Sequence, residues 1–398
     1  MLDLGAVKRQ IDQMAQEQKE SQQRFLDRVD AAVAELQRWE TGWEDLDAKI
    51  TRGHPPWLVA RGLSGPPGAT FLPPERPKQV TVIATDGSQI FPDRHEVASC
   101  FLINIGSAVI HYGTGERPQL TSRPLLFYRD RDLFPQWAGR RMLMNNELLA
   151  LKRGALEITE LAALAERVTE AGKRVVALVD GTLILWMLDG CPSDFKKEAL
   201  EPYLAAFHRF RQARVPVGGY ISDPGSADLV NALRVGLCPE ETPDCQRCPC
   251  QCGVDARQLH IGPCEQIAGV TDALLLTRQL GRNERSGVFR SSSRILEEYG
   301  EHAVSFFYIN VGQEFVRIEI PAWVAENRDM VGLIHSCVCD QTEKGRGYPV
   351  VLSEAHEKAV VRGSDRELFY RFLRDAFVKC DLSVSISSKA VRKLGPGV

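Results

Sequence analysis

The sequence predicts an α/β protein, and two observations support this fold class. Residues 80–85 and 175–179 are apolar runs of β-formers, and each run ends in Asp-Gly followed by a hydroxyl residue. Continuous apolar runs of this length are typical of strands that are buried on both faces. Further along the chain, strand-like segments alternate with segments of helical periodicity, a pattern that is typical of α/β domains.

Length and composition limit the classes of function. The 398 residues are enough for a large core and two or three modules. The formal net charge is −3, so any nucleic-acid surface must be a local patch and not an overall excess of basic residues. No apolar run approaches the ~20 residues of a membrane span, and the charged N-terminal stretch lacks the apolar part of a secretion signal. We therefore expect a cytoplasmic protein with no membrane segment.

The chain divides into three predicted parts. Residues 1–52 form an N-terminal helical segment, because apolar residues recur there at helical spacing among charged and Gln residues. This segment is either one long helix or a helical hairpin, and its apolar face packs on a partner, on a second copy or on its own domain. Residues 53–78 are rich in Pro and Gly and predict an extended connector. Residues 79–398 form the main domain, with a Cys-rich insert at 238–264.

The main domain contains further predicted elements in chain order. Residues 97–112 suggest a hairpin broken at Gly106 and Ser107, and residues 118–136 look irregular. A long helical pattern runs from about Gly139 to Ala171, before the second Asp-Gly strand. The other predicted elements are a helix at 196–214, a strand at 215–221, a helix at 226–235, a hairpin at 303–320, and helices to about 378 before a basic tail.

Two carboxylates end the two apolar strands. If these strands lie side by side and parallel, Asp86 and Asp180 emerge at the same edge of the sheet. Two carboxylates held together repel each other unless a cation lies between them. Hard divalent cations prefer such oxygen ligands. The alternative is two unrelated strand ends at which aspartate begins a turn.

A third carboxylate is expected from the helix that precedes Asp180. The strand to Asp180 rises roughly 17 Å, and an antiparallel helix rises 1.5 Å per residue, so the level of Asp180 is reached about a dozen residues back. This estimate favours Glu157 or Glu160 over Glu147. Glu157 also continues the apolar stripe of this helix, where a buried carboxylate needs a partner or a metal. The alternative is that Glu157 pairs with Arg153 at the rim of the helix.

His356 is a candidate of a different kind. It shares one face of the predicted helix at 352–360 with Leu352 and Ala359. A lone histidine in that position is most often a core residue with satisfied hydrogen bonds. The alternative is a metal ligand or a proton donor.

Four motifs, spread in order over about residues 80–365, resemble the NurA family of DNA-end-processing nucleases. The motifs are Asp86-Gly87-Ser88, Asp180-Gly181-Thr182 with Leu183-Ile184-Leu185-Trp186, Gly219-Tyr220-Ile221-Ser222 leading into Val230-Asn231-Ala232-Leu233-Arg234, and Gly347-Tyr348-Pro349 leading to Glu354-Ala355-His356.

The resemblance implies a ribonuclease H-like fold, with a mixed sheet flanked by helices and a carboxylate site for Mn²⁺ or Mg²⁺. It implies a 5′–3′ exonuclease and single-strand endonuclease that acts on single- and double-stranded DNA ends during double-strand break resection. It also implies a homodimer and a hexameric, ring-shaped ATPase partner of the HerA type.

Carried over one residue at a time, the resemblance assigns the catalytic and metal-binding positions. The first aspartate of the family falls on Asp86, the second on Asp180, the helical glutamate on Glu157 and the late histidine on His356. Asp86 and Asp180 would ligate the metal and Glu157 would complete its shell. His356 would ligate the metal or protonate the leaving oxygen.

The cysteines predict a second metal site. The chain has eleven cysteines, and about half lie in one short segment, which in a reducing compartment favours metal binding over disulfides. Cys245 and Cys248 form a Cys-x-x-Cys pair, which is typical of tetrahedral metal sites. The site would hold a structural Zn²⁺ or an iron–sulfur cluster, and the alternative is a set of free thiols. The predicted ligands are Cys238, Cys245, Cys248, Cys252 and Cys264, with Cys250 and His260 nearby.

DNA contacts require local cations and aromatic side chains. The aromatic candidates are Trp137 and Phe289, which either stack on a single strand or pack in the core. A catalytically silent adaptor that clamps DNA for an ATPase is the alternative function. An actin-like ATPase is a further class, but the glycine-rich phosphate loops that it needs are not found. The basic candidates are Arg140, Arg141, Lys196, Lys197, Arg282, Arg285, Arg290, Lys389, Arg392 and Lys393.

Overall fold

The computed structural model describes residues 2–91, 99–137, 139–245, 247–248 and 262–381, and the chain forms two compact units. Across the described residues, no helix combines the length and apolar character that crossing a bilayer requires. Unit 1 comprises Met1–Pro74, Tyr220–Leu296 and Ala303–Ala325, and unit 2 comprises Glu75–Gly219, Glu297–His302 and Glu326–Val398. The N-terminal helical segment therefore belongs to the same unit as residues from the second half of the chain.

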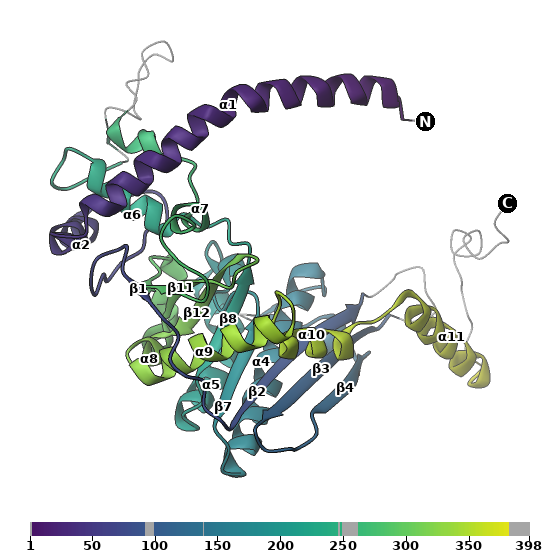
Figure 1. The fold of residues 1–398 in the computed structure, drawn as a ribbon. Helices are drawn as coiled ribbons and strands as arrows, with labels where there is room; N and C mark the ends of the chain where they lie inside the picture. The colour runs from purple at the N-terminus through teal and green to yellow at the C-terminus, as the bar shows by residue number, and fades with distance from the viewer. Residues whose placement is uncertain (1, 92–98, 138, 246, 249–261, 382–398) are drawn as a thin grey trace. The chain divides into compact units, whose positions relative to one another are not determined.

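Unit 2 is built on a mixed sheet whose strands follow the order β8-β7-β2-β3-β4 (Figure 1). Strand β3 is antiparallel to both β2 and β4, whereas β7 is parallel to β2. Strands β2, β3 and β4 form an antiparallel meander, and β7 and then β8 lie beside β2. This is the ribonuclease H-like arrangement, so the predicted fold class is confirmed. The strands are β2 (Val80–Ile90), β3 (Phe101–Tyr112), β4 (Gln119–Phe127), β7 (Val175–Asp180) and β8 (Val217–Ser222).

Helices cover both faces of the β2–β3 part of this sheet. On one face, Thr85 Oγ1 donates a hydrogen bond to the carbonyl of Glu157 in α4 (Asn146–Glu170). On the other face, Asn104 Nδ2 donates to the carbonyl of Ala359 in α10 (Val350–Ala359). Because side chains alternate along a strand, odd-numbered residues of β2 face α4 and even-numbered residues face α10.

The remaining elements of unit 2 lie around this core. Helix α5 (Ser193–Gln212) packs against α4. The others are α3 (Asp130–Leu133), the two-residue strands β5 (Gln136–Trp137) and β6 (Arg140–Arg141), η1 (Trp186–Leu188), α9 (Arg328–Lys344) and α11 (Gly363–Lys379), while η3 (Arg294–His302) contributes its second half.

Unit 1 buries one apolar cluster between helices and a small antiparallel sheet with the order β1-β9-β11-β12. The second half of α1 packs on this cluster through Val29, Ala32 and Leu36, whereas Ile11 and Met14 in its first half are exposed. Its elements are α1 (Leu4–Arg38), α2 (Trp43–Arg52), β1 (Thr70–Phe71), α6 (Asp228–Leu237), η2 (Pro263–Ile267), α7 (Asp272–Leu276), β9 (Arg285–Ser286), β10 (Phe289–Arg290), β11 (Val304–Asn310), β12 (Phe315–Pro321) and α8 (Ala322–Ala325).

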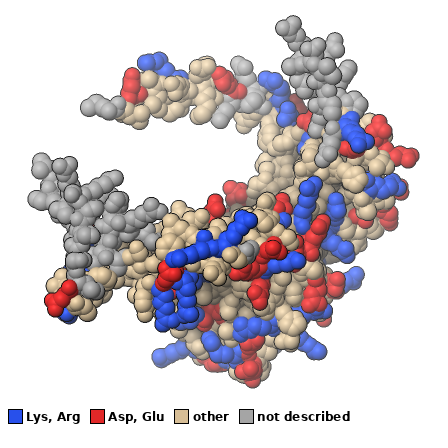
Figure 2. Space-filling view, turned by 180° about the vertical axis from the view of Figure 1, so that it is seen from behind, with Lys and Arg blue, Asp and Glu red and all other residues tan. Residues whose placement is uncertain are grey.

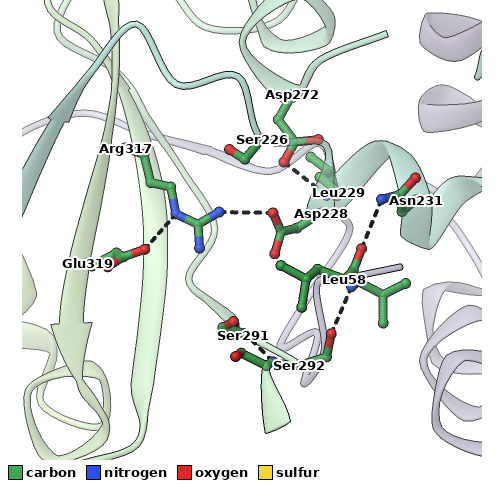
Figure 3. Close-up of polar contacts among 12 residues, drawn as sticks. Leu58, Ser226, Asp228, Leu229, Asn231, Asp272, Ser291, Ser292, Arg317 and Glu319 are labelled. Carbon is green, nitrogen blue, oxygen red and sulfur yellow. Dashed lines mark hydrogen bonds and ion pairs between the residues drawn. The ribbon is translucent and has the colours of Figure 1, made fainter. Parts of the chain in front are cut away.

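A buried ionic cluster fixes the start of α6 in unit 1. Figure 3 shows the Arg317 guanidinium between two carboxylates, with Nη1 3.0 Å from Asp228 Oδ2 and Nε 3.1 Å from Glu319 Oε1. All three residues are at most 3% exposed. The carboxylate of Asp272 accepts hydrogen bonds from the amides of Leu229 and Val230, which are otherwise orphan donors of the first turn of α6.

The same helix holds two residues of the NurA-like motif. Asn231 Nδ2 donates to the carbonyl of Leu58 (2.9 Å), and Arg234 forms an ion pair with Glu265 (2.7 Å) and lies over the ring of Trp57. Both side chains therefore tie α6 to its neighbours within unit 1.

Four local predictions were wrong. The first apolar strand does not end at Asp86, because β2 continues to Ile90 and pairs with β3 over this length. Residues 97–112 do not form a hairpin, because β3 continues through Gly106 and pairs with β2 and β4. Residues 118–136 are not irregular, because they include β4, which pairs with β3.

The fourth prediction concerns the long helix, which begins at Asn146 and not near residue 139. For the three strands the deciding contacts come from other strands, which a local pattern does not contain. The start of the helix is instead set by a local cap, because Asn145 accepts a hydrogen bond from the amide of Leu148.

Charge is mixed on the surface. Figure 2 shows Lys and Arg side chains interspersed with Asp and Glu on the face drawn, in keeping with the net charge of −3. Two of the predicted DNA-contact residues have packing roles: Phe289 is 3% exposed within the unit 1 core, and Arg285 stacks on Phe71 at 4.2 Å.

Arg317→Ala should lower the free energy of unfolding by about 3–5 kcal/mol, because two buried carboxylates would lose their counter-charge. Urea unfolding of the full chain measures this loss. Arg38→Ala is the matched control: its guanidinium is 65% exposed beside Glu35, so the expected loss is below about 1 kcal/mol. Equal losses for the two variants would contradict a role for the buried cluster in stability.

Candidate active site

Asp86 and Asp180 lie next to each other at the carboxyl end of β7, which is the strand end referred to below; β2 continues past Asp86 to Ile90. In the parallel pairing of β2 with β7, Thr85 is opposite Val179, so Asp86 and Asp180 occupy the following position on the two neighbouring strands. Residues in register on neighbouring strands point to the same face, which here is the face covered by α10. Burial raises the pKa of Asp180, the charge of Asp86 raises it further, and a hydrogen bond with Tyr348 opposes both effects.

His356 of α10 contacts the first of these aspartates. Its Nδ1 lies 2.8 Å from Asp86 Oδ2, and its side chain is 61% exposed. The alternative of a buried core histidine is therefore wrong. The other oxygen, Asp86 Oδ1, accepts a hydrogen bond from the amide of Gly87 at 2.7 Å. Both oxygens of this carboxylate are thus held in place.

Glu157 reaches the same strand end from the opposite face of the sheet. Its carboxylate occupies the space above Gly87, where a Cβ atom would lie 2.3 Å from Glu157 Oε1. Any side chain at position 87 would therefore displace this carboxylate. The close approach of Glu157 therefore explains why position 87 is a glycine.

Arg153 holds Glu157 in this position. Arg153 Nε lies 3.1 Å from Glu157 Oε1, and Arg153 Nη1 donates to Gln89 Oε1 at 2.8 Å. The Nε–H is not aimed at the carboxylate oxygen, so the contact is ionic, and Oε1 is buried without a hydrogen-bond partner among the described residues. Burial raises the pKa of Glu157 to about 7; Asp86 and Asp180 also raise it, whereas Arg153 lowers it.

The two other glutamates of α4 lie elsewhere. Glu160 forms an ion pair with Arg123 at 2.8 Å, and Arg167 lies 3.9 Å away. Glu147 lines a cavity at the N-terminal end of α4. Of the three candidates, Glu157 is the one that contacts the strand end.

The donor set suits a hard divalent cation. Three carboxylates and one imidazole from β2, β7, α4 and α10 surround one strand end. Their ligand atoms do not all lie within 4.8 Å of one another in the metal-free structure. Within the described ranges, the group that meets this criterion is a different one, His208, Glu301 and His302. In that group Glu301 is already paired with Arg211. At the strand end the carboxylates are instead held by Arg153, His356 and Tyr348.

Sequence reasoning missed two supporting residues. Tyr348 belongs to the NurA-like Gly347-Tyr348-Pro349 motif, which was a signal for its role at Asp180. Tyr203 of α5 lies beside Gly154, where a Cβ would be 2.1 Å from its hydroxyl. Burial and then the charge of Glu157 raise the pKa of Tyr203. No local pattern in the sequence connects Tyr203 to Glu157.

The described cysteines of the insert converge. The pKa of the Cys245 thiol is raised to about 11. Burial is the largest cause, and the neighbouring thiols of Cys238, Cys248 and Cys264 contribute. Arg234 donates to the carbonyl of Cys264, and Cys238 caps the helix that carries Arg234. Four thiols are therefore grouped at the end of α6. Cys250, Cys252 and His260 lie outside the described residues.

The NurA domain model matches residues 80–361, which include Asp86, Glu157, Asp180 and His356. The chain belongs to the NurA family. The predicted resemblance is thereby confirmed, over 282 of the 398 residues (361 − 80 + 1). No curated protein matches the chain.

Solved NurA structures are similar to this chain. The NurA nuclease from Sulfolobus solfataricus has 13% sequence identity and a TM-score of 0.46, and the match covers 78% of this chain and 87% of that one. A NurA structure described as bound to dAMP and manganese has 11% identity and a TM-score of 0.32, with coverage of 73% and 86%.

Glu157→Gln should stabilise the metal-free protein at high pH. Glu157 has a folded pKa of about 7 against an ordinary 4.5, so the folded state keeps a proton that the unfolded state releases, and stability falls as pH rises between these values. The shift corresponds to about 3 kcal/mol. Urea unfolding in EDTA should show Glu157→Gln more stable than the parent at pH 8 by up to that amount, and similar to it at pH 5.

Glu160→Gln is the matched control for this measurement. Glu160 is on the same helix, and it forms an ion pair with Arg123, whose side chain is 52% exposed. It should change stability by less than about 1 kcal/mol at either pH. A parent protein that gains stability between pH 5 and pH 8 relative to Glu157→Gln would show that the carboxylate is not buried as described.

Proposed function

We propose that the chain is a divalent-metal-dependent deoxyribonuclease that hydrolyses phosphodiester bonds at DNA ends. The observation that carries this proposal is the position of Asp86 beside Asp180 on parallel strands, with Glu157 reaching them from α4 and His356 from α10. Membership of the NurA family supports it.

Asp86, Asp180 and Glu157 would hold Mn²⁺ or Mg²⁺. Their crowding favours a cation, because burial and then mutual repulsion raise the pKa values of Asp180 and Glu157, and a divalent ion would offset both effects. When bound, such an ion supplies the Lewis acidity for attack of water on the phosphodiester and balances the developing charge.

The chain's own residues would prepare this site. Tyr348 orients the Asp180 carboxylate, and Gly87 and His356 orient that of Asp86. A cation beside Glu157, whose pKa burial raises to about 7, would favour its ionised form, and Arg153 would remain next to that carboxylate. The exposed ring of His356 is placed to ligate the cation or to protonate the leaving oxygen.

Family membership also supports the wider context of this activity. We propose 5′–3′ exonuclease and single-strand endonuclease activities in double-strand break resection, in a cytoplasmic homodimer that works with a HerA-type hexameric ATPase. A catalytically silent adaptor for the same ATPase would retain DNA binding and lack cleavage, so the two functions separate in a cleavage assay without ATP.

Asp86→Asn and Asp180→Asn should each reduce Mn²⁺-dependent degradation of linear single- and double-stranded DNA by about three orders of magnitude or more, because each removes a charged ligand. The assay is run without ATP, and circular dichroism checks the fold. Asp189→Asn is the control, since it changes an exposed carboxylate on the loop after β7. Full activity in either strand-end variant, or no cleavage by the parent protein, would refute the nuclease.

We further propose that Cys238, Cys245, Cys248 and Cys264, with Cys252, hold a structural Zn²⁺ or an iron–sulfur cluster. The grouping of four thiols supports this: burial and then the neighbouring groups, cysteines among them, raise the pKa of Cys245 and of Cys264, and a bound cation would stabilise the thiolates.

Metal analysis of anaerobically purified protein tests the cysteine site. The parent should carry about one equivalent of zinc, or the iron and sulfide of a cluster, and Cys248→Ser should lose most of it because one ligand is removed. Cys380→Ser, which changes an exposed thiol at the end of α11, should retain the metal. The metal site would be refuted if the parent protein contained no metal, or if Cys248→Ser and Cys380→Ser contained the same amount. The cysteines of the insert would then be free thiols.

A further inference from the structure

Unit 2 contains a cavity of about 360 Å³ that the proposed chemistry does not use. Its walls come from the first two turns of α4, the short β5–β6 strand pair, and the segment from η1 to the start of α5. All of these elements lie within one compact unit. The volume is at the lower end of the range for small-ligand sites and leaves room for one flat heterocycle with its sugar.

The walls are apolar and aromatic. Trp137 and Phe195 form a tilted pair with ring centroids 5.0 Å apart and an interplanar angle of 34°. Leu148, Leu151 and Met187 complete the apolar lining. Flat aromatic and thioether surfaces of this kind suit the π face of a nucleobase, and stacking on them does not depend on base identity.

The rim carries charged groups without partners. Arg140, Glu147 and Asp194 line the cavity, and none of them forms an ion pair or a hydrogen bond from its charged group within the described residues. A guanidinium at the rim suits a phosphate. Two carboxylates accept hydrogen bonds, so they suit the amino groups of adenine or cytosine. Thymine presents carbonyl oxygens at the equivalent positions, and carboxylates repel these oxygens.

The cavity lies close to the carboxylate site along the same elements. Leu151 precedes Glu157 by six residues of α4, which is about 9 Å along the helix axis. On the opposite wall, Met187 follows Asp180 by seven residues. A single strand that reaches one site can therefore reach the other within a few nucleotides, whereas a base stacked in a duplex would first have to leave the stack to enter the cavity.

We propose that this cavity binds one unstacked nucleobase of the strand that leads to the carboxylate site, with preference for bases that carry an exocyclic amino group. The inference rests on the proposed nuclease function and names a part of the substrate that the carboxylates do not contact. Trp137 and Phe195 provide stacking, Glu147 and Asp194 accept from the amino group, and Arg140 contacts a neighbouring phosphate.

Binding of labelled single strands tests the proposal without metal or cleavage. Fluorescence anisotropy in EDTA compares eight-nucleotide dA and dT strands on the Asp86→Asn/Asp180→Asn protein. We expect dA to bind roughly tenfold more tightly than dT, since one or two hydrogen bonds to the amino group distinguish them. Trp137→Ala in this background should weaken dA binding roughly 10- to 100-fold, which corresponds to the loss of one stacked base.

Two further variants separate stacking from a structural effect. Trp137→Phe keeps an aromatic face and should bind dA within about threefold of the parent. Phe372→Ala removes an exposed aromatic ring from α11, outside the cavity, and should leave dA binding unchanged. Glu147→Ala should narrow the ratio between dA and dT affinity because it removes an acceptor. Unfolding temperatures of all variants check that the unit remains folded.

The outcomes distinguish this proposal from the nuclease. If the parent protein cleaves DNA but Trp137→Ala binds dA as tightly as Phe372→Ala does, the nucleobase site is refuted and the nuclease stands. If the parent does not cleave, yet the dA preference is present and lost in Trp137→Ala, the nuclease is refuted and the nucleobase site stands. Absence of binding to either strand refutes the nucleobase site, and the cleavage assay on the parent protein then decides the nuclease separately.

Discussion

The register between β2 and β7 is the constraint on which the site depends. A parallel pair with Thr85 opposite Val179 brings two aspartates, far apart in sequence, to one edge and one face of the sheet. A shift of one residue would turn one of them to the opposite face. The continuous apolar runs before each aspartate do not by themselves resist such a shift, because both faces of these strands are apolar. The close approach of Glu157 at Gly87 and of α10 at Gly106 does, because only glycine leaves room at these two positions.

Two glycines allow helices to approach this edge from both sides. Gly87 leaves room for Glu157 on the α4 face, and Gly106, which is opposite Asp86 in β3, leaves room for α10. A Cβ at Gly106 would lie 2.3 Å from the carbonyl oxygen of Ala355. Because neither glycine has a side chain, both helices approach the sheet closely at this point. The carboxylate of Glu157 from α4 and the imidazole of His356 from α10 therefore reach the same strand end.

Much of this arrangement can be predicted from the sequence, because its determinants are local. The Asp-Gly strand ends, the rise of the helix before Asp180, and the apolar stripe that includes Glu157 are all present in short windows. What could not be predicted depends on distant partners. Strand β3 reads as a broken hairpin until its pairing on both edges is known, and Asp272 stabilises α6 from more than forty residues away. Unit 1 is likewise assembled from three separate segments of the chain.

Helix α4 shows how position alone assigns different environments to one residue type. Its three candidate glutamates differ little in sequence context, yet they have different surroundings. Glu160 pairs with Arg123, the Oε1 atom of Glu157 is buried above Gly87, and Glu147 is exposed at a cavity with no partner for its carboxylate among the described residues. From Glu147 to Glu157 the helix turns by nearly three full turns at 3.6 residues per turn and advances about 15 Å. The carboxylate whose pKa burial raises to about 7 is the one beside the two aspartates, which is where a cation is of most use. The exposed carboxylate, Glu147, lines a cavity together with Trp137 and Phe195, where a hydrogen-bond acceptor, and not a metal ligand, matches the surroundings.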